Sequence, residues 1–202
     1  GLGRHAWDVP FYLFNPNYAL VATIGEAFYG ISIMFTKLSI LAFYLRFATN
    51  WKLRAAIYTT MAIAVIYSLL LAFIFVYRCR PIQKHWDLTI TYGSCIDWRK
   101  INIFSGVMNT ATDFTILVLP VLMIRLQLPI RQKIGVIVVL MTGGFVTCIT
   151  IIRLKSIVNS VSNPDFTWED VPQIVWWTTE VDIAIVCACL PAGKPFLRRH
   201  FP

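Results

Sequence analysis

The sequence predicts an all-α protein, a polytopic bundle of transmembrane helices, and two observations carry that prediction. Of its 202 residues, 57% are hydrophobic and 14% are charged, whereas soluble domains average about 45–50% and about 25%. Five apolar runs are each long enough, as helices, to cross a hydrocarbon core about 30 Å thick, which takes roughly 20 residues. Buried helices of a soluble protein are not expected to give five such runs in succession.

Each run predicts one helix, and together the helices are expected to form a single membrane domain over residues 1–202. The predicted helices cover residues 18–45, 53–77, 101–126, 133–157 and 171–190. The second run has Arg54 as its only charged residue. The third contains Pro120, which removes a backbone hydrogen bond and is expected to kink the helix. The fourth and fifth runs are of similar length, and each contains ionisable residues.

The segments between the runs differ in their density of basic residues. Residues 46–54, 125–133 and 194–202 each hold three Lys or Arg and no acid. The remaining segments, residues 1–17, 78–100 and 158–170, together hold six Lys or Arg and six acids in 53 residues. The positive-inside rule places the first set in the cytosol. We therefore expect a multi-pass protein of the plasma membrane with residue 1 outside and residue 202 in the cytosol.

Composition and motifs argue against several functions. The net charge of +8 does not predict nucleic-acid binding, because the charges lie in short clusters between apolar runs. The sequence has no nucleophile elbow, phosphate-binding loop or His/Cys metal spacing, so neither an enzyme nor a metal site is expected. Because the chain starts at Gly1 without a Met, we interpret it as a fragment of a longer protein.

Ionisable residues inside the apolar runs are the candidates for function, because a charge in hydrocarbon costs several kcal/mol unless it faces a bundle interior or a wet cavity. They are Glu26, Lys37, Asp113, Arg153, Glu180 and Asp182. Asp113 lies about 18 Å along its helix, the deepest of the acids. Asn109, four residues earlier, shares its helix face. Lys37 is expected to extend toward the cytosolic surface.

We interpret the four acids, Asn109 and Arg153 as an outward-facing polar pocket for a ligand, with Arg153 able to pair with one of the acids. Two alternatives stay open: hydrogen bonds that only hold helices together, and acids that face lipid. Glu180 and Asp182 are about 200° apart on one helix, so they cannot both point at one site.

Cys79 and Cys95 lie in the same 23-residue segment, residues 78–100. Under the predicted topology this segment faces an oxidising compartment, so we predict a disulfide between them. The bond would close a loop of about 15 residues and contribute about 3 kcal/mol in the chain-entropy model. The alternative is a pair of free thiols.

The order and spacing of residues along nearly the whole chain resemble the fungal rhodopsin-domain family of seven-helix, GPCR-like membrane proteins. The matching residues include Lys37 to Leu41 with Tyr44 and Arg46, Cys79, Pro81, Trp86, Gly93, Cys95, Asn109, Asp113, Leu119, Pro120, Gly144, Arg153, Trp168, Trp177, Glu180 and Pro191. The resemblance implies that the five helices are helices three to seven, with the first two missing.

The resemblance also implies receptor-like sensing of a ligand, unknown in identity, with a possible cytosolic signalling partner. The alternative function is a solute transporter or channel that uses the intramembrane acids. Despite the family name, no cofactor is expected. A retinal Schiff base needs a lysine buried in the final helix, and residues 171–190 contain none, while Lys37 lies in another helix.

Overall fold

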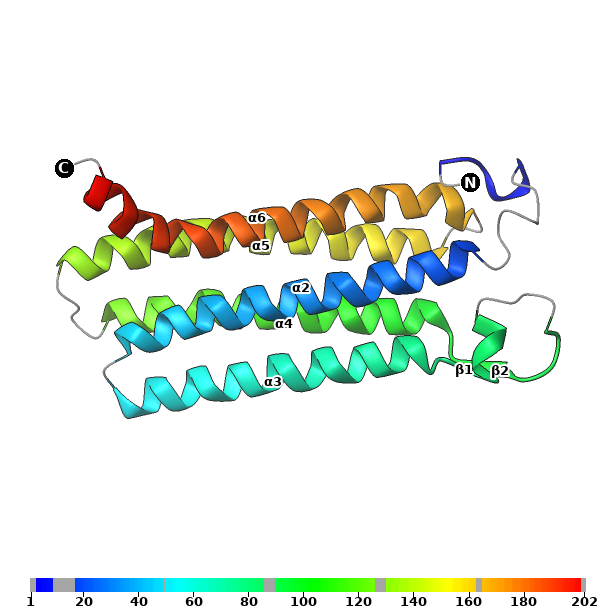
Figure 1. The fold of residues 1–202 in the computed structure, drawn as a ribbon, viewed down its shortest axis with the longest axis horizontal. Helices are drawn as coiled ribbons and strands as arrows, with labels where there is room; N and C mark the ends of the chain where they lie inside the picture. The colour runs from blue at the N-terminus through cyan, green and yellow to red at the C-terminus, as the bar shows by residue number, and fades with distance from the viewer. Residues whose placement is uncertain are drawn as a thin grey trace.

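The computed structural model describes residues 3–8, 17–48, 50–85, 90–125, 130–162 and 165–200, and long helices make up most of these ranges. They are α2 (Asn17–Phe47), α3 (Trp51–Val76), α4 (Trp98–Arg125), α5 (Ile130–Ser162) and α6 (Phe166–His200). The short elements are η1 (Ala6–Asp8), β1 (Cys79–Arg80), η2 (Ile82–His85) and β2 (Ser94–Cys95). The predicted all-α bundle is confirmed (Figure 1).

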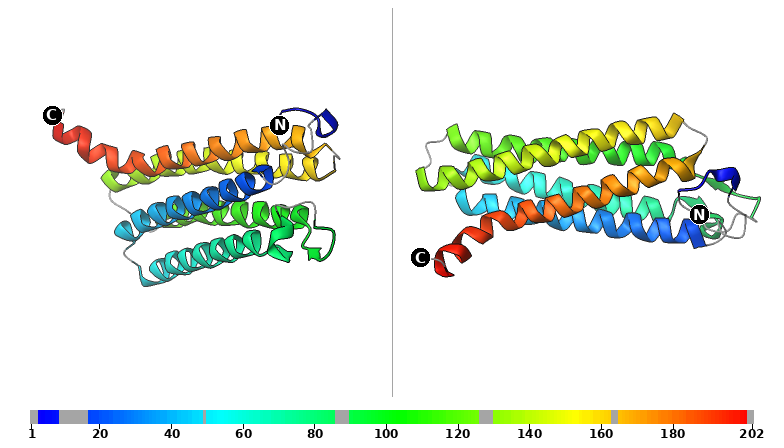
Figure 2. Two further views of the ribbon diagram at one scale, coloured as in Figure 1. Left: turned by 45° about the vertical axis from the view of Figure 1, so that its right-hand side comes forward. Right: turned by 90° about the horizontal axis from the view of Figure 1, so that it is seen from above.

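Within the described ranges, four helices have both the length and the hydropathy to cross a membrane. These spans are Leu20–Arg46, Trp51–Val76, Trp98–Leu122 and Leu140–Val158. The predicted fifth helix is present as α6, which runs beside α5 and α2 for the length of the bundle (Figures 1 and 2). It falls outside this group of spans because Glu180 and Asp182 lie at its centre and lower its hydropathy.

The helices close into a ring. Each long helix packs against the next one in the chain, and α6 packs back against α2. α4 and α5 pack tightly at Gly106, where an added Cβ would lie 3.0 Å from a Leu154 methyl carbon. The small residue therefore lets these two helices come together, as is typical of membrane bundles.

Apolar and charged side chains are distributed in the reverse of the pattern in soluble proteins. Phe28, Phe73 and Met141 are 67%, 65% and 71% exposed on the outer faces of the helices. Lys37 and Glu180, by contrast, are only 4% and 1% exposed. A charged interior with an apolar exterior is the arrangement expected of a bundle surrounded by lipid.

The helices extend beyond the apolar runs that predicted them. α4 begins at Trp98 rather than residue 101, and α6 spans Phe166–His200 rather than residues 171–190. The runs mark only the hydrocarbon-facing part, whereas the helical backbone continues into polar flanks. The last turns of α6 bend away from the bundle (Figure 1). This part of the helix contains Pro191, which removes a backbone hydrogen bond. α4 continues through the fully buried Pro120.

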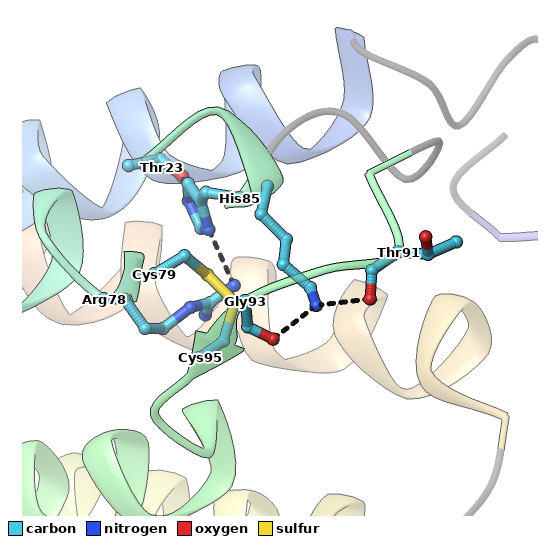
Figure 3. Close-up of a disulfide and its surroundings, with 8 residues drawn as sticks. Thr23, Arg78, Cys79, His85, Thr91, Gly93 and Cys95 are labelled. Atoms are coloured by element: carbon cyan, nitrogen blue, oxygen red, sulfur yellow. Dashed lines mark hydrogen bonds between the residues drawn. A yellow bond between two sulfur atoms is a disulfide. The ribbon is translucent and has the colours of Figure 1, made fainter. Parts of the chain in front are cut away.

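The connection between α3 and α4 forms a compact cap at one end of the bundle (Figure 3). Cys79 and Cys95 form the predicted disulfide and face each other in the antiparallel pair β1–β2. Gly93 has φ +91°, and a Cβ there would lie 2.2 Å from the Arg80 carbonyl oxygen, so the turn requires glycine. We call this the disulfide end, and the opposite end, where Arg46 and Lys52 lie, the basic end.

The N-terminal segment also docks at the disulfide end (Figure 1). His5 Nδ1 lies 2.5 Å from an Asp165 carboxylate oxygen at the start of α6. The His5 ring stacks on Trp7 and on Trp168, with centroids 4.8 and 5.0 Å apart. These contacts fasten η1 to α6.

Candidate functional site

The first buried ion pair joins α2 to α4. Lys37 Nζ lies 2.9 Å from Asp113 Oδ1, and the two side chains are 5% and 10% exposed. The ammonium also donates to Asn109 Oδ1 at 2.7 Å, to the Asn109 carbonyl at 3.1 Å and to Thr112 Oγ1 at 2.6 Å. Thr150 of α5 donates to the other oxygen of Asp113 at 3.1 Å.

The prediction that Lys37 extends toward the cytosolic surface is therefore wrong. Its side chain points into the ring, because α2 presents this face to α4, where four oxygens surround the ammonium. An amine paired with a carboxylate and bonded to neutral acceptors can stay in the bundle interior without reaching headgroups.

The second buried ion pair joins α5 to α6. Arg153 Nε lies 3.1 Å from Glu180 Oε2, and the side chains are 3% and 1% exposed. Tyr29 of α2 donates to the same Glu180 oxygen at 3.0 Å, and Arg153 Nη1 donates to the Tyr29 hydroxyl. The guanidinium carbon also lies 5.1 Å from the centroid of the Tyr29 ring. The predicted pairing of Arg153 thus falls on Glu180.

Asn109 connects the two pairs. Its Nδ2 donates to Glu180 Oε1 at 2.7 Å, while its Oδ1 accepts from Lys37. Tyr67 of α3 also donates to Asn109 Oδ1, at 3.4 Å. The result is one set of contacts drawn from all five long helices, which we call the charged network: Tyr29, Lys37, Tyr67, Asn109, Asp113, Thr150, Arg153 and Glu180. Its two cations balance its two anions.

Two cavities flank the charged network. The disulfide-side cavity has about 80 Å³ of room for the centres of water molecules and is lined by Tyr29, Asn109 and Arg153 among others. The basic-side cavity has about 40 Å³ and is lined by Lys37, Asp113 and Glu180. Since a water needs roughly 10–15 Å³ by this measure, the larger cavity has room for about five waters or a small organic group. The network therefore lies between the two spaces.

The remaining predicted site residues lie outside the network. Glu26 lines the disulfide-side cavity and has no hydrogen-bond or ion-pair partner among the described residues. Asp182 is exposed and lines neither cavity. It follows Glu180 by two residues, about 200° around the helix, so burying Glu180 turns Asp182 outward.

Sequence reasoning missed the roles of Tyr29, Tyr67 and Thr150. Two of them carry a usable signal, because a helical face repeats every three or four residues. Tyr29 follows Glu26 by three positions, and Thr150 precedes Arg153 by three. Tyr67 has no ionisable residue near it in the sequence, so nothing in its surroundings distinguishes it from a packing residue.

A ring of helices with an apolar exterior and a balanced charged interior defines a polytopic membrane protein. Within that class, the chain belongs to the fungal rhodopsin domain family, whose model matches residues 1–199. It is 30% identical, over 91% of its length and 47% of the relative's, to a SAT4 family membrane protein of Emericella nidulans. No solved structure matches the chain.

Other relatives take their names from biosynthetic gene clusters. The chain is 29% identical to the wortmanamides biosynthesis cluster protein C of Talaromyces wortmannii, over 86% of this chain and 47% of that protein. It is 22% identical to the satratoxin biosynthesis SC1 cluster protein 4 of Stachybotrys chartarum, over 84% and 62% respectively. The chain thus spans about half the length of the first relatives it matches.

A retinal Schiff base, which the word rhodopsin in the family's description suggests, does not fit the described residues. Lys37 is the buried lysine among them, and its ammonium contacts four oxygens. A Schiff-base nitrogen keeps only one N–H, so attaching an aldehyde there would remove two of the three hydrogen bonds that the ammonium can donate to these buried oxygens.

Proposed function

We propose that this membrane protein is a receptor-like sensor, in which a ligand in the disulfide-side cavity acts on the charged network. The supporting observation is the position of that network between the two cavities. Asn109 and Arg153 line the disulfide-side cavity and both contact Glu180, which lines the basic-side cavity. A ligand that bonds to either residue competes with its contact to Glu180 and so alters the lining of the other cavity.

The orientation we propose puts the disulfide end outside the cell. A structural disulfide forms in an oxidising compartment, and the disulfide lies at that end. The basic segments lie at the other end, which agrees with the positive-inside rule. In the plasma membrane, the ligand would then enter from outside, and a signalling partner would meet the basic end in the cytosol.

We call the coupling between the two cavities through Glu180 the relay. It carries a signal only if the ligand distinguishes between two conformations of the protein. A ligand shifts a conformational equilibrium only by as much as its affinity differs between the two states. The bonds of Glu180 supply that difference, because Tyr29, Asn109 and Arg153 hold it from three separate helices. Changing one of these bonds leaves the others strained or unpaired, which favours a rearranged set of helix contacts.

A second candidate function is a solute transporter or channel. The observation that favours it is the pair of cavities on opposite sides of one charged barrier. In this alternative the network opens to each side in turn, and the acids carry the solute or a coupled proton across.

The native thiol of Cys187 offers a test of the relay, because it is buried and lines the basic-side cavity. In a Cys148→Ala/Cys189→Ala background of the full-length protein, we expect Arg153→Gln combined with Glu180→Gln to change the alkylation rate of Cys187 several-fold. Asn102→Ala is the matched control, because Asn102 lines the disulfide-side cavity and, among the described residues, has no hydrogen bond to the network. An unchanged rate in the double variant would contradict the relay.

Proton flux into liposomes separates the two functions. The sensor predicts that liposomes containing the protein and an entrapped pH-sensitive dye acidify no faster than protein-free liposomes. Flux that is present in the wild type and lost in Asp113→Asn would instead favour the transporter.

A further inference from the structure

Among the described residues, Glu26 differs from Asp113 and Glu180 in having no cation within ion-pair distance. Asp113 contacts Lys37, and Glu180 contacts Arg153. Glu26 lines the disulfide-side cavity, yet no donor or cation among the described residues lies within hydrogen-bond or ion-pair distance. A carboxylate two turns inside a membrane helix needs a partner, and the cavity is where that partner can bind.

The rest of the cavity lining suits an organic cation. Four aromatic rings line it, from Tyr29, Tyr67, Phe75 and Trp177, together with aliphatic side chains such as Met34 and Leu71. Aromatic faces attract cations, most strongly where water is excluded. The indole Nε1 of Trp177 is buried without an acceptor among the described residues. It remains able to donate to a bound molecule.

The charges that act on Glu26 and Arg78 also favour a cation. Arg78 is the basic group that acts on Glu26, but its guanidinium donates to His85 Nδ1 at 2.8 Å and is held in the α3–α4 connection (Figure 3). Asp170 adds negative potential at Glu26, and Asp97 offsets Arg78. Three acids, Glu26, Asp97 and Asp170, therefore accompany Arg78, while Arg153, the base that lines the cavity, is paired with Glu180. This balance disfavours a ligand anion.

We propose that the disulfide-side cavity binds a small, largely apolar amine, with Glu26 as its counter-ion and the aromatic rings around its cationic head. This inference rests on the proposed sensing function and names the class of ligand. The apolar body lies against Met34, Leu71 and Phe75, and an oxygen or nitrogen acceptor on the molecule accepts from Trp177. The size of the cavity limits the buried part to about one ring or a short chain.

The amine class can be tested with three probes of nearly the same shape: benzylamine, benzyl alcohol and benzoate. Thermal unfolding of the full-length protein, purified in one detergent, is measured against the concentration of each probe at neutral pH. We expect benzylamine to stabilise the wild type saturably, benzyl alcohol to bind more weakly, and benzoate to have no saturable effect.

Variants assign the preference to Glu26. Glu26→Gln keeps the shape of the side chain and should weaken benzylamine roughly 10- to 100-fold, to the level of the alcohol, as expected for a lost hydrogen bond to a charged group. Glu26→Asp keeps the charge and should retain the preference. Asp182→Asn, which removes an acid that lines neither cavity, should change nothing. Probe uptake by micelles is common to all variants and cancels between them.

The outcomes separate this inference from the proposed function. Equal effects of amine and alcohol, a preference for benzoate, no saturable effect of benzylamine, or an amine preference that survives in Glu26→Gln would each overturn the amine class. None of these would alter the response of Cys187 to the Arg153 and Glu180 variants, which tests the relay. Conversely, amine binding that depends on Glu26, together with an unresponsive Cys187, would retain the ligand class and reject the relay.

Discussion

At the scale of single residues, Lys37 and Asp113 are held in place by each other. Either charge alone is costly in a membrane interior, but together they form a pair 2.9 Å apart, with Asn109, Thr112 and Thr150 completing the hydrogen bonds. Replacing such a pair with two apolar residues can leave the free energy of unfolding almost unchanged. Removing only one partner, however, leaves an uncompensated buried charge.

A double-mutant cycle tests this coupling. Lys37→Met and Asp113→Leu should each lower the free energy of unfolding by about 3–5 kcal/mol, because each leaves one buried charge. The combined variant should lose clearly less than the sum, because no charge remains. Unfolding in mixed micelles titrated with denaturing detergent gives the three values. Asp182→Leu is the control and should cost little, because Asp182 is exposed. Additive losses would contradict a direct ion pair.

His85 is a second residue whose state follows from its neighbours. Arg78 can only donate, so the Nδ1 of His85 that meets it at 2.8 Å must accept. Nε2 then carries the proton and donates to the Thr23 hydroxyl of α2 (Figure 3). Burial, with the nearby Arg78 charge as a lesser cause, lowers the pKa of His85 from 6.5.

This lowered pKa predicts a stability that falls in mild acid. Below pH 6.5 the unfolded chain takes up a proton at His85 before the folded protein does, so the free energy of unfolding decreases as the pH falls toward the folded pKa. Above pH 6.5 the contribution is constant. His85→Gln should remove this part of the pH dependence. Unfolding midpoints of both proteins across this range test it, and parallel curves would contradict the prediction.

At the scale of elements, the α3–α4 connection at the disulfide end is held by a disulfide and several hydrogen bonds. The disulfide joins β1 to β2, and Lys84 Nζ donates to the Gly93 carbonyl at 2.8 Å and to the Thr91 carbonyl at 3.3 Å (Figure 3). His85 contacts Thr23 and so attaches the segment to α2, and it also contacts Arg78, which lies within the connection just after α3. The disulfide constrains a connection that contains little regular structure.

Removing the disulfide should therefore lower the free energy of unfolding, and by the same amount whichever cysteine is replaced. Cys79→Ser, Cys95→Ser and the double variant should each lose about 3 kcal/mol, because one bond is lost in all three. Thermal unfolding of the purified variants gives the comparison. A double variant with twice the loss of either single variant would show that the two sulfurs contribute separately.

The helices and the disulfide could be predicted from the sequence, because both depend on local information: apolar run length, and cysteines that share a loop. The helix face on which each charged residue lies, toward lipid or toward the bundle interior, could not be predicted. α2 is apolar around most of its circumference, so its pattern does not distinguish the face toward lipid from the face toward α4. The sequence therefore predicts Lys37 near the surface, although its side chain lies inside the ring. For Glu180 and Asp182, helical spacing excluded a shared direction, but only the packing of α6 shows which of the two is buried.

At the scale of the whole molecule, ring closure and the charged network depend on each other. The return of α6 to α2 brings Glu180 to Tyr29, 151 positions apart in the chain. Lipid tails are as apolar as the helix surfaces, so the hydrophobic effect does not drive the helices together. Packing and interhelical hydrogen bonds therefore supply much of the specificity. A network that draws on all five helices fixes their order, and it lies between the two cavities.

The orientation of this ring is the last prediction, and thiol labelling in intact cells tests it. In the Cys148→Ala/Cys189→Ala background, Lys100→Cys adds a thiol at the disulfide end and Lys52→Cys adds one at the basic end, and both positions are exposed. Because Lys52 belongs to a segment rich in basic residues and without acids, the positive-inside rule retains it in the cytosol. An impermeant maleimide should therefore label Lys100→Cys in intact cells, and Lys52→Cys only after permeabilisation. The unmodified background gives the baseline for Cys187. The reverse labelling pattern would invert the topology and move the amine-binding cavity to the cytosolic side, even though every contact within the ring stayed the same.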